Sequence, residues 1–363
     1  MHRGDKRLAA TITAAFLLSG LAQAGMQGIL ITHADATGKE LETAKRRGID
    51  SVVLYLHEGQ TGKNVPAARR IVEHGFALYY WIEIGRNPKM ADEHPEWMAS
   101  LQGHPEWRRL FPRAPLPGRG EVVKTYPWVP VAYKESFDAH LQRVSKLLSG
   151  HPTPKGIFLN DLQAAPSACG CGNSFCRWTP DYGPVRTATR LGDDAAAQFS
   201  AAVQKLVPSA EIVPVWTTEC EEHDGAKEGR CAGVACFPGA CWREYTKQLM
   251  PVARESRRLA ALVPYKAFDR DLPQYGPTAG WVKSAIQSFA EMPPLRNGQA
   301  ISASRILAIL QGWDVTEDEI NKQIQQSSEA GSGGYVISRM RIDQEWRPKL
   351  VKVPSPPVET GSR

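Results

Sequence analysis

The chain has 363 residues, of which 42% are hydrophobic, and its formal net charge is +6 at pH 7. This length and hydrophobic content allow one large domain or two ordinary ones. The basic residues are spread along the sequence without a long run, which argues against a protein that binds nucleic acid.

Residues 1–24 have the features of a secretory signal peptide. Basic residues precede an apolar stretch from Leu8 to Leu21, and Ala22-Gln23-Ala24 is the small-x-small pattern that signal peptidase cuts. The apolar stretch is too short and too interrupted for a membrane span, and no later segment approaches the roughly 20 apolar residues that a spanning helix needs. We expect a secreted or periplasmic protein that begins at Gly25 and has no membrane span.

Short apolar runs alternate with amphipathic helical patterns along the rest of the sequence, which is the pattern of βαβ units with buried parallel strands. The runs that we expect to form strands are 28–32, 51–56, 77–84, 156–160, 211–217, one within 259–267, 306–311 and 335–338. Gly48, Gly75 and Gly331 stand where helices should stop, and Thr316 with Glu319 forms a capping-box pattern. Eight such units predict an α/β (β/α)8 TIM barrel.

The predicted barrel is a single domain over residues 25–350, with long loops at the carboxyl-end face, and the Pro-rich segment 351–363 is expected to be a disordered tail. The longest loop, from Gly85 to Pro130, follows the third strand. Loops of this length inside a compact domain usually have a function. We therefore expect it to cover the carboxyl ends of the strands, together with the cysteine-rich segments.

Acidic residues follow most of the predicted strands, at the positions where barrel enzymes carry their catalytic groups. Cleavage of a glycosidic bond needs two carboxyl groups, and flat aromatic side chains stack on the apolar faces of sugar rings. In-strand aromatic residues alternate between the barrel interior and the helix layer, so some of them must belong to the core. The candidate substrate-binding residues are His33, Tyr55, Glu83, Trp216, Trp313, Asp314 and Arg339.

Two segments carry a family resemblance. One is the run Gly156-Ile157-Phe158-Leu159-Asn160-Asp161, which leads into Cys169-Gly170-Cys171 and Cys176-Arg177. The other is His94-Pro95-Glu96-Trp97, which is repeated at 104–107. Both resemble segments of uncharacterised secreted bacterial (β/α)8-barrel proteins that are assigned to the glycoside hydrolases. The resemblance covers most of the mature chain in layout but is specific in these two segments alone. Asn160 stands where an acid is common, which leaves Asp161 as the one carboxylate of that pair.

The resemblance implies a glycoside hydrolase that acts on an extracellular or cell-surface polysaccharide. In the related alpha-amylase and alpha-galactosidase groups, an aspartate that ends strand four is the nucleophile, and its acid/base partner comes from strand five or six. Transferred by position, this makes Asp161 the nucleophile and Glu219 the acid/base, with Asp269 as the rival. Asp161 as a structural N-cap is one alternative, and the missing acid at Asn160 keeps open a non-catalytic glycan-binding barrel.

The seven cysteines all lie beyond residue 168, in two clusters. In an oxidising compartment they are expected to form disulfides that leave one thiol over, and their pairing cannot be read from the sequence. The C-x-C-x4-C spacing departs from zinc signatures, and a metal-dependent hydrolase built on His33 and His57 lacks an HxH or HExxH pattern. We expect neither a metal nor a cofactor, and the sequence does not indicate an oligomeric state.

Overall fold

The computed structural model describes residues 25–94, 97, 100–102, 128–162, 177–179, 191–217, 249–264, 280–290 and 301–340. The predicted signal peptide and tail, all the cysteines, and the candidates Glu219 and Asp269 lie outside these ranges. Within the described ranges, no helix is both long enough and apolar enough to cross a membrane.

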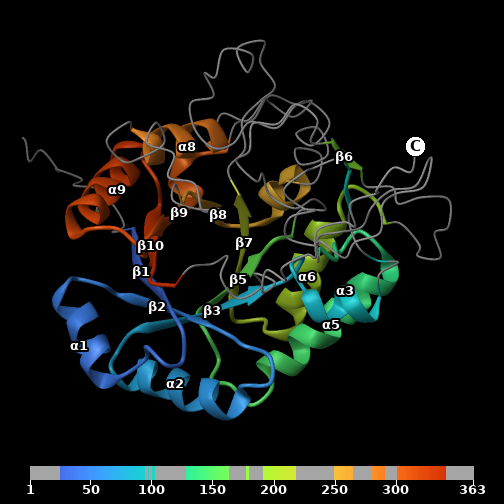
Figure 1. Ribbon diagram of the computed structural model, residues 1–363, viewed down its shortest axis with the longest axis horizontal. Coiled ribbons are helices and arrows are strands. Elements are labelled where there is room, and N and C mark those ends of the chain that lie inside the picture. Colours follow the sequence, from blue (N-terminus) through green and yellow to red (C-terminus); the bar gives the residue numbers. More distant parts are fainter. Residues whose placement is uncertain are drawn as a thin grey trace, which may run out of the picture.

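Eight parallel strands close into a barrel with helices on its outside (Figure 1). The order around the barrel is β1-β10-β9-β8-β7-β5-β3-β2, and the first and last strands pair with Met26 opposite Gly334. The strands are β1 (Met26–Ile31), β2 (Ser51–Tyr55), β3 (Ala77–Glu83), β5 (Gly156–Asn160), β7 (Glu211–Thr217), β8 (Leu259–Leu262), β9 (Ile306–Gln311) and β10 (Gly334–Ser338). The predicted (β/α)8 TIM barrel is confirmed, with one strand in each predicted apolar run.

The helices lie outside the barrel and connect its strands (Figure 1). They are α1 (Gly38–Arg46), α2 (Thr61–Glu73), α3 (Pro88–Glu93), α5 (Lys134–Leu148), α6 (Ala195–Leu206), a stretch at 249–255, α8 (Trp281–Ala290), the 3-10 helix Ala303–Arg305 and α9 (Glu317–Glu329). Gly48 and Gly75 follow α1 and α2 at φ +78° and +80°, a left-handed conformation that favours glycine. Thr316 and Glu319 form the predicted capping box of α9.

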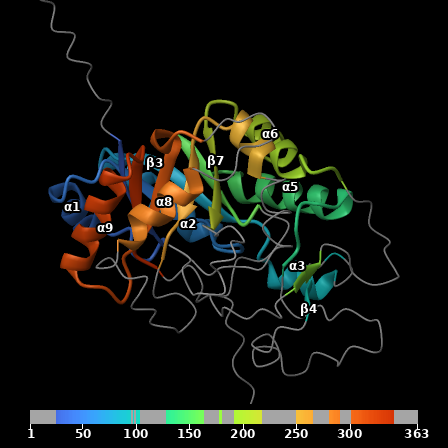
Figure 2. The same ribbon diagram turned by 90° about the horizontal axis from the view of Figure 1, so that it is seen from above.

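A short antiparallel sheet stands apart from the barrel strands. It pairs β4 (Ser100–Gln102), which belongs to the long loop after β3, with β6 (Arg177–Thr179), which belongs to the segment after β5. Figure 2 shows α3 and β4 together on one side of the barrel. The loops that follow two neighbouring barrel strands are therefore tied to each other.

Strand residues alternate between two apolar cores, because successive side chains point to opposite faces of a strand. Trp81 and Phe158 stack inside the barrel with 5.9 Å between their ring centroids, in a cluster that also includes Tyr55 and Trp313. The intervening residues pack against the helices in a second, larger cluster. Trp216 belongs to that outer cluster, so its ring faces the helix layer.

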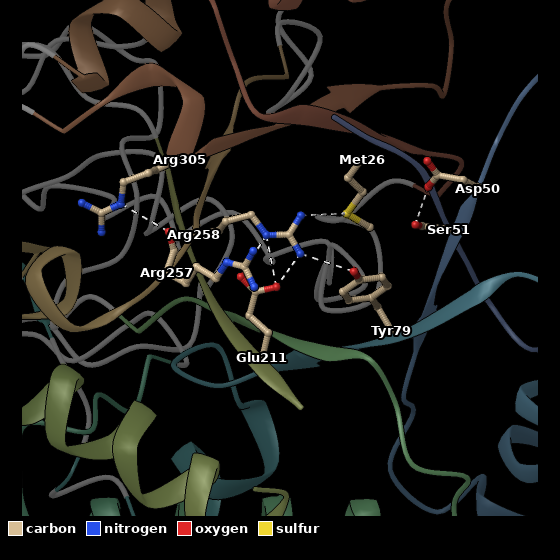
Figure 3. Close-up of polar contacts among 8 residues, drawn as sticks. All are labelled: Met26, Asp50, Ser51, Tyr79, Glu211, Arg257, Arg258 and Arg305. Carbon is tan, nitrogen blue, oxygen red and sulfur yellow. Dashed lines mark hydrogen bonds and ion pairs between the residues drawn. The ribbon is translucent and has the colours of Figure 1, made fainter. Parts of the chain in front are cut away.

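An ion pair lies at the amino-terminal end of the barrel (Figure 3). Arg258, directly before β8, donates from Nε to Glu211 Oε1 at 2.9 Å and to Oε2 at 3.1 Å, and its Nη2 donates to the Tyr79 hydroxyl at 3.3 Å. Burial alone would lower the pKa of Arg258, but its bonds to Glu211 and Tyr79 outweigh burial and raise the pKa. The pair stabilises the packing of β3, β7 and β8 at this end.

Removal of one partner of this ion pair should destabilise the protein more than removal of both. We expect Glu211→Leu to lower the free energy of unfolding by about 3 kcal/mol, because Arg258 is left without its counter-charge. The double variant Glu211→Leu/Arg258→Met should lose less stability than Glu211→Leu alone, because it leaves no unpaired charge. Urea denaturation checks this, with Tyr79→Phe, expected to cost about 1 kcal/mol, as the control. Additive losses would contradict the role given to the pair.

Candidate active site

The carboxyl ends of β3 and β5 place Glu83 and Asn160 side by side. The two residues are register partners in the parallel pair, and each lies two positions after an interior residue, Trp81 or Phe158, so both share the face that points into the barrel. Glu83 Oε1 accepts a hydrogen bond from Trp81 Nε1 at 2.9 Å, and Oε2 accepts one from Asn160 Nδ2 at 2.9 Å. Glu83 is 8% exposed, so these bonds hold a buried carboxyl group in one orientation.

Asp161 follows β5 in a left-handed backbone conformation with φ +60°. Aspartate tolerates this region better than most residues, but the conformation still costs about 1 kcal/mol. The Asp161 carbonyl accepts a hydrogen bond from the Gly85 N–H at 3.0 Å, and a Cβ at position 85 would lie 2.5 Å from that oxygen. Glycine at position 85 therefore lets the ends of β3 and β5 approach closely enough to hold this turn.

Arg86 faces two carboxyl groups at this point. Its Nη2 lies 3.1 Å from Glu83 Oε2, and its Nε lies 3.9 Å from Asp161 Oδ2. The side chains of all three residues are almost entirely buried, with 4% of that of Asp161 exposed. A single guanidinium thus shares its charge between two acids in a region with little water.

Burial raises the pKa of the Asp161 carboxyl well above its ordinary value. The Arg86 guanidinium opposes this effect, whereas the charge of Glu83 and a hydrogen bond to its side chain raise the pKa further. One cation does not offset two buried carboxylates together with the loss of their hydration. Asp161 therefore keeps its proton to a higher pH than an exposed aspartate does.

Four buried polar atoms at the carboxyl ends of the strands have no hydrogen-bond partner within the described structure. They are His33 Nδ1, Asn160 Oδ1, Asp161 Oδ2 and Trp313 Nε1. The residues come from the ends of β1, β5 and β9, or directly follow them. Buried polar groups nearly always find a partner, so this mixture of donors and acceptors suits a ligand rich in hydroxyl groups, or ordered water.

Two histidines and a tyrosine lie together after β1 and β2. The rings of His33 and His57 meet edge to face with centroids 5.6 Å apart, and His57 packs on Tyr55 at 4.5 Å. Nearby, Arg143 of α5 pairs with Glu58 at 2.6 Å and also donates to the Glu83 carbonyl oxygen. Within the described ranges, no three His, Cys, Asp or Glu side chains come together in a way that could hold a metal ion.

The remaining predicted substrate-binding residues lie in different parts of the barrel. Trp313 joins the interior cluster, and Asp314 follows it in a left-handed conformation at φ +54°, exposed to solvent. Trp216 faces the helix layer, and the exposed Arg339 lines a groove between α1 and α9 outside the barrel. Neither Trp216 nor Arg339 is thus among the residues that surround Asp161.

The loop after β3 begins at this end of the barrel, as its sequence position predicts. Trp128, near the end of that loop, forms a bridge with Arg86, and its ring lies against Gly85. The rings of His94 and Trp97 from the first HPEW copy stack with centroids 3.7 Å apart. The second HPEW copy and both cysteine segments lie outside the described residues.

The sequence did not predict that Trp81, Arg86 and Asn160 contact Glu83, or that Arg86 also contacts Asp161. Alternation along β3 could have shown that Trp81 and Glu83 share a face, since they are two residues apart. Nothing in the sequence pairs β3 with β5 at the required register. No sequence feature marks Arg86 as a site residue apart from its position shortly after a strand.

No protein-family model and no curated protein sequence matches the chain. Solved structures are similar in fold. An endo-1,4-beta-D-mannanase from Thermotoga petrophila has 10% identity over 90% of this chain and 93% of its own, with a TM-score of 0.48. A class V chitinase from Pseudomonas fluorescens has 9% identity over 90% and 96%, with a TM-score of 0.46. A pyruvate carboxylase from Rhizobium etli has 9% identity over 87% of this chain and 24% of its own, with a TM-score of 0.39.

The raised pKa of Asp161 predicts how pH affects stability. In the unfolded chain Asp161 ionises near pH 3.9, whereas in the folded protein it stays protonated to a higher pH. Its contribution to the free energy of unfolding is therefore complete below about pH 3.9 and is lost as pH rises through the folded-state pKa. An asparagine side chain cannot ionise, and asparagine also tolerates the left-handed backbone at this position. We therefore expect Asp161→Asn to gain stability relative to the wild type as pH rises.

Urea denaturation at a series of pH values above about 4 measures this difference. Asp138→Asn is the matched control, because it makes the same substitution at an exposed position on α5. Its stability relative to the wild type should change little over the same range. A constant difference between Asp161→Asn and the wild type would contradict the protonation of Asp161.

Proposed function

We propose that the protein is a secreted or periplasmic glycoside hydrolase that cleaves a glycosidic bond of an extracellular or cell-surface polysaccharide. The observation that carries the proposal is the buried group of Asp161, Glu83 and Arg86 at the carboxyl ends of β3 and β5. Barrel enzymes carry their catalytic groups at these ends. The unpartnered donors and acceptors of His33, Asn160 and Trp313 add support for a substrate rich in hydroxyl groups.

Asp161 fits the role of general acid in this reaction. Cleavage of a glycosidic bond requires a proton on the leaving oxygen, and the donor must still be protonated at the working pH. Burial and the adjacent Glu83 give Asp161 that property. The sequence-based assignment made Asp161 the nucleophile, but a nucleophile must be ionised, so the surroundings of Asp161 favour proton donation.

Glu83 is proposed to position Asp161 and to sustain its protonation. The two carboxyl groups of a glycosidase lie about 5 to 5.5 Å apart in retaining enzymes and roughly 6.5 to 9.5 Å apart in inverting ones, on opposite sides of the scissile bond. Glu83 Oε2 and Asp161 Oδ2 both contact the Arg86 guanidinium, at 3.1 and 3.9 Å, so we place the two carboxyl groups on the same side of the scissile bond. The proposal gives the second carboxylate to Glu219, with Asp269 as the rival.

Asp161→Asn should abolish most of the hydrolysis without unfolding the protein. We expect kcat/KM to fall by about 10²- to 10⁴-fold, because the amide cannot donate a proton to the leaving oxygen as an acid does. A hydrolysis screen over polysaccharides identifies the substrate, and the variant is then compared with the wild type and with Asp138→Asn. Undiminished hydrolysis by Asp161→Asn would contradict its assignment. Binding of a glycan by the wild type without any hydrolysis would instead favour the non-catalytic barrel that Asn160 leaves open.

The two neighbours of Asp161 should shift the pH profile in opposite directions. A general acid works while it is protonated, so kcat/KM should fall as pH rises through the pKa of Asp161. Glu83→Gln removes a charge that raises this pKa, so the falling limb should move to lower pH. Arg86→Gln removes a charge that lowers it, so the limb should move to higher pH. Shifts in the same direction, or none, would overturn the proposed coupling.

A further inference from the structure

Helix α5 presents buried polar side chains to the barrel, where an amphipathic helix usually carries apolar ones. Ser136, His140 and Arg143 lie four and three residues apart, so they share one face of the helix. Ser136 and His140 are fully buried, and 14% of the Arg143 side chain is exposed. A buried polar group costs free energy unless it has a partner, so the contacts of these three residues show what the helix holds in place.

The first two of these residues hold the end of the long loop that follows β3. Ser136 Oγ donates a hydrogen bond to the Pro130 carbonyl oxygen at 2.6 Å, and His140 Nε2 lies 2.8 Å from the Val129 carbonyl oxygen. Burial and the charge of Arg143 lower the pKa of His140 to about 3. The neutral ring has one N–H, and its contact with a carbonyl oxygen makes Nε2 the donor. The loop therefore returns to the barrel along two fixed carbonyl groups.

Arg143 holds the start of the same loop. Its Nη2 donates to the carbonyl oxygen of Glu83, the last residue of β3, and its Nη1 donates to Glu58 Oε1 at 2.6 Å. Between the two ends of the loop, the Val129 N–H donates to the Gly85 carbonyl oxygen at 2.7 Å. One helix thus fixes both ends of the loop, and Arg143 is its side chain that contacts Glu83.

The position of Arg143 follows from where the pairing of β2 with β3 ends. At this end of the pair, the Leu56 N–H donates to the Trp81 carbonyl oxygen at 3.0 Å. Carbonyl groups two residues apart along a strand point to the same side, so the Glu83 carbonyl also points toward β2. Arg143 supplies a donor there, in the place of the next strand N–H, and so satisfies this carbonyl group.

We propose that Arg143 is a positioning residue that fixes the end of β3 and so holds the Glu83 carboxyl group beside Arg86 and Asp161. Arg143 acts from the helix layer, through the backbone of Glu83. A guanidinium suits this task because its planar fork bonds the Glu58 carboxylate and the Glu83 carbonyl at the same time. The catalytic use of this arrangement rests on the proposed function, whereas the position of Glu83 can be tested without it.

The stability series for Asp161→Asn tests the position of Glu83. Glu83 raises the pKa of Asp161, so it enlarges the stability that Asp161→Asn gains over its parent as pH rises. Arg143→Met/Glu58→Gln removes both charges of the ion pair and releases the end of β3. In this background the gain from Asp161→Asn should be smaller and should be complete at a lower pH, as measured by urea denaturation. A gain equal to that in the wild-type background would overturn the proposal.

Lys134→Met/Asp138→Asn is the matched control, because it removes an exposed ion pair from the same helix. It should leave the gain from Asp161→Asn unchanged. A reduction of the same size in the control would also overturn the proposal, since the reduction would then not depend on the contact with Glu83.

Hydrogen exchange at the end of β3 provides a second measurement, on a milder variant. In Arg143→Lys the ammonium can pair with Glu58 but cannot keep the second bond of the fork, to the Glu83 carbonyl. The amides of Ile84 and Gly85 should then exchange about 10- to 100-fold faster, because a hydrogen bond from a charged group no longer restrains this segment. Amides of α2 should exchange at the wild-type rate. Wild-type exchange rates at Ile84 and Gly85 would contradict the role of Arg143.

Kinetics on an identified substrate connect the position of Glu83 to hydrolysis. Arg143→Met/Glu58→Gln should lower kcat about 10- to 100-fold with KM almost unchanged, and the falling limb of its pH profile should move to lower pH, as in Glu83→Gln. An active protein in which neither kcat nor the pH profile changes would contradict a catalytic effect of Arg143. A wild-type protein that hydrolyses no glycan would contradict the proposed function alone, because the stability series and hydrogen exchange need no substrate.

Discussion

Closure of the barrel through the pairing of β1 with β10 is the constraint on which the rest of the structure depends. Once the sheet is closed, every strand residue must face either the interior or the helix layer, and all the carboxyl ends meet on one face. That geometry places Glu83 opposite Asn160 and Asp161 directly beyond them. Closure also brings β1 and β10 together without a connection between them, and Ile29 and Tyr335 on the outer face of these two strands are only partly buried.

The two ends of the barrel use the same kinds of side chain for different purposes. At the amino-terminal end, Arg258 faces a single carboxylate, Glu211, in a two-pronged contact that balances charge and holds neighbouring strands together. At the carboxyl end, Arg86 faces both Glu83 and Asp161, and its charge is insufficient for two buried carboxylates. The first arrangement serves stability, whereas the second leaves a proton on one acid, which is useful for chemistry and costly for folding.

Backbone geometry also distinguishes the carboxyl end of the barrel, which carries the candidate site, from the amino-terminal end. Among the described residues, Asp161 and Asp314 are the two non-glycine residues with positive φ, and each lies shortly after a barrel strand at the carboxyl end. Strained backbone of this kind persists where surrounding contacts enforce it, and it concentrates at functional sites. For Asp161 the enforcing contact is the bond from the Gly85 N–H to its carbonyl oxygen. The strain is thus tied to the approach of β3 and β5 that also brings the two acids together.

The sequence by itself determined the eight strands, the helix stops at Gly48 and Gly75, and the placement of Asp161 at the end of a strand, because these follow from local periodicity and backbone preference. Tertiary structure decided which side chains meet. Glu83 and Asn160 lie 77 positions apart, and only the register of β3 against β5 joins them. Whether Trp216 faces the interior or the helices depends on the stagger of the closed barrel, which no single strand reveals. The protonation of Asp161 likewise depends on burial and on two neighbours from another strand end, so it could not be read from the order of residues.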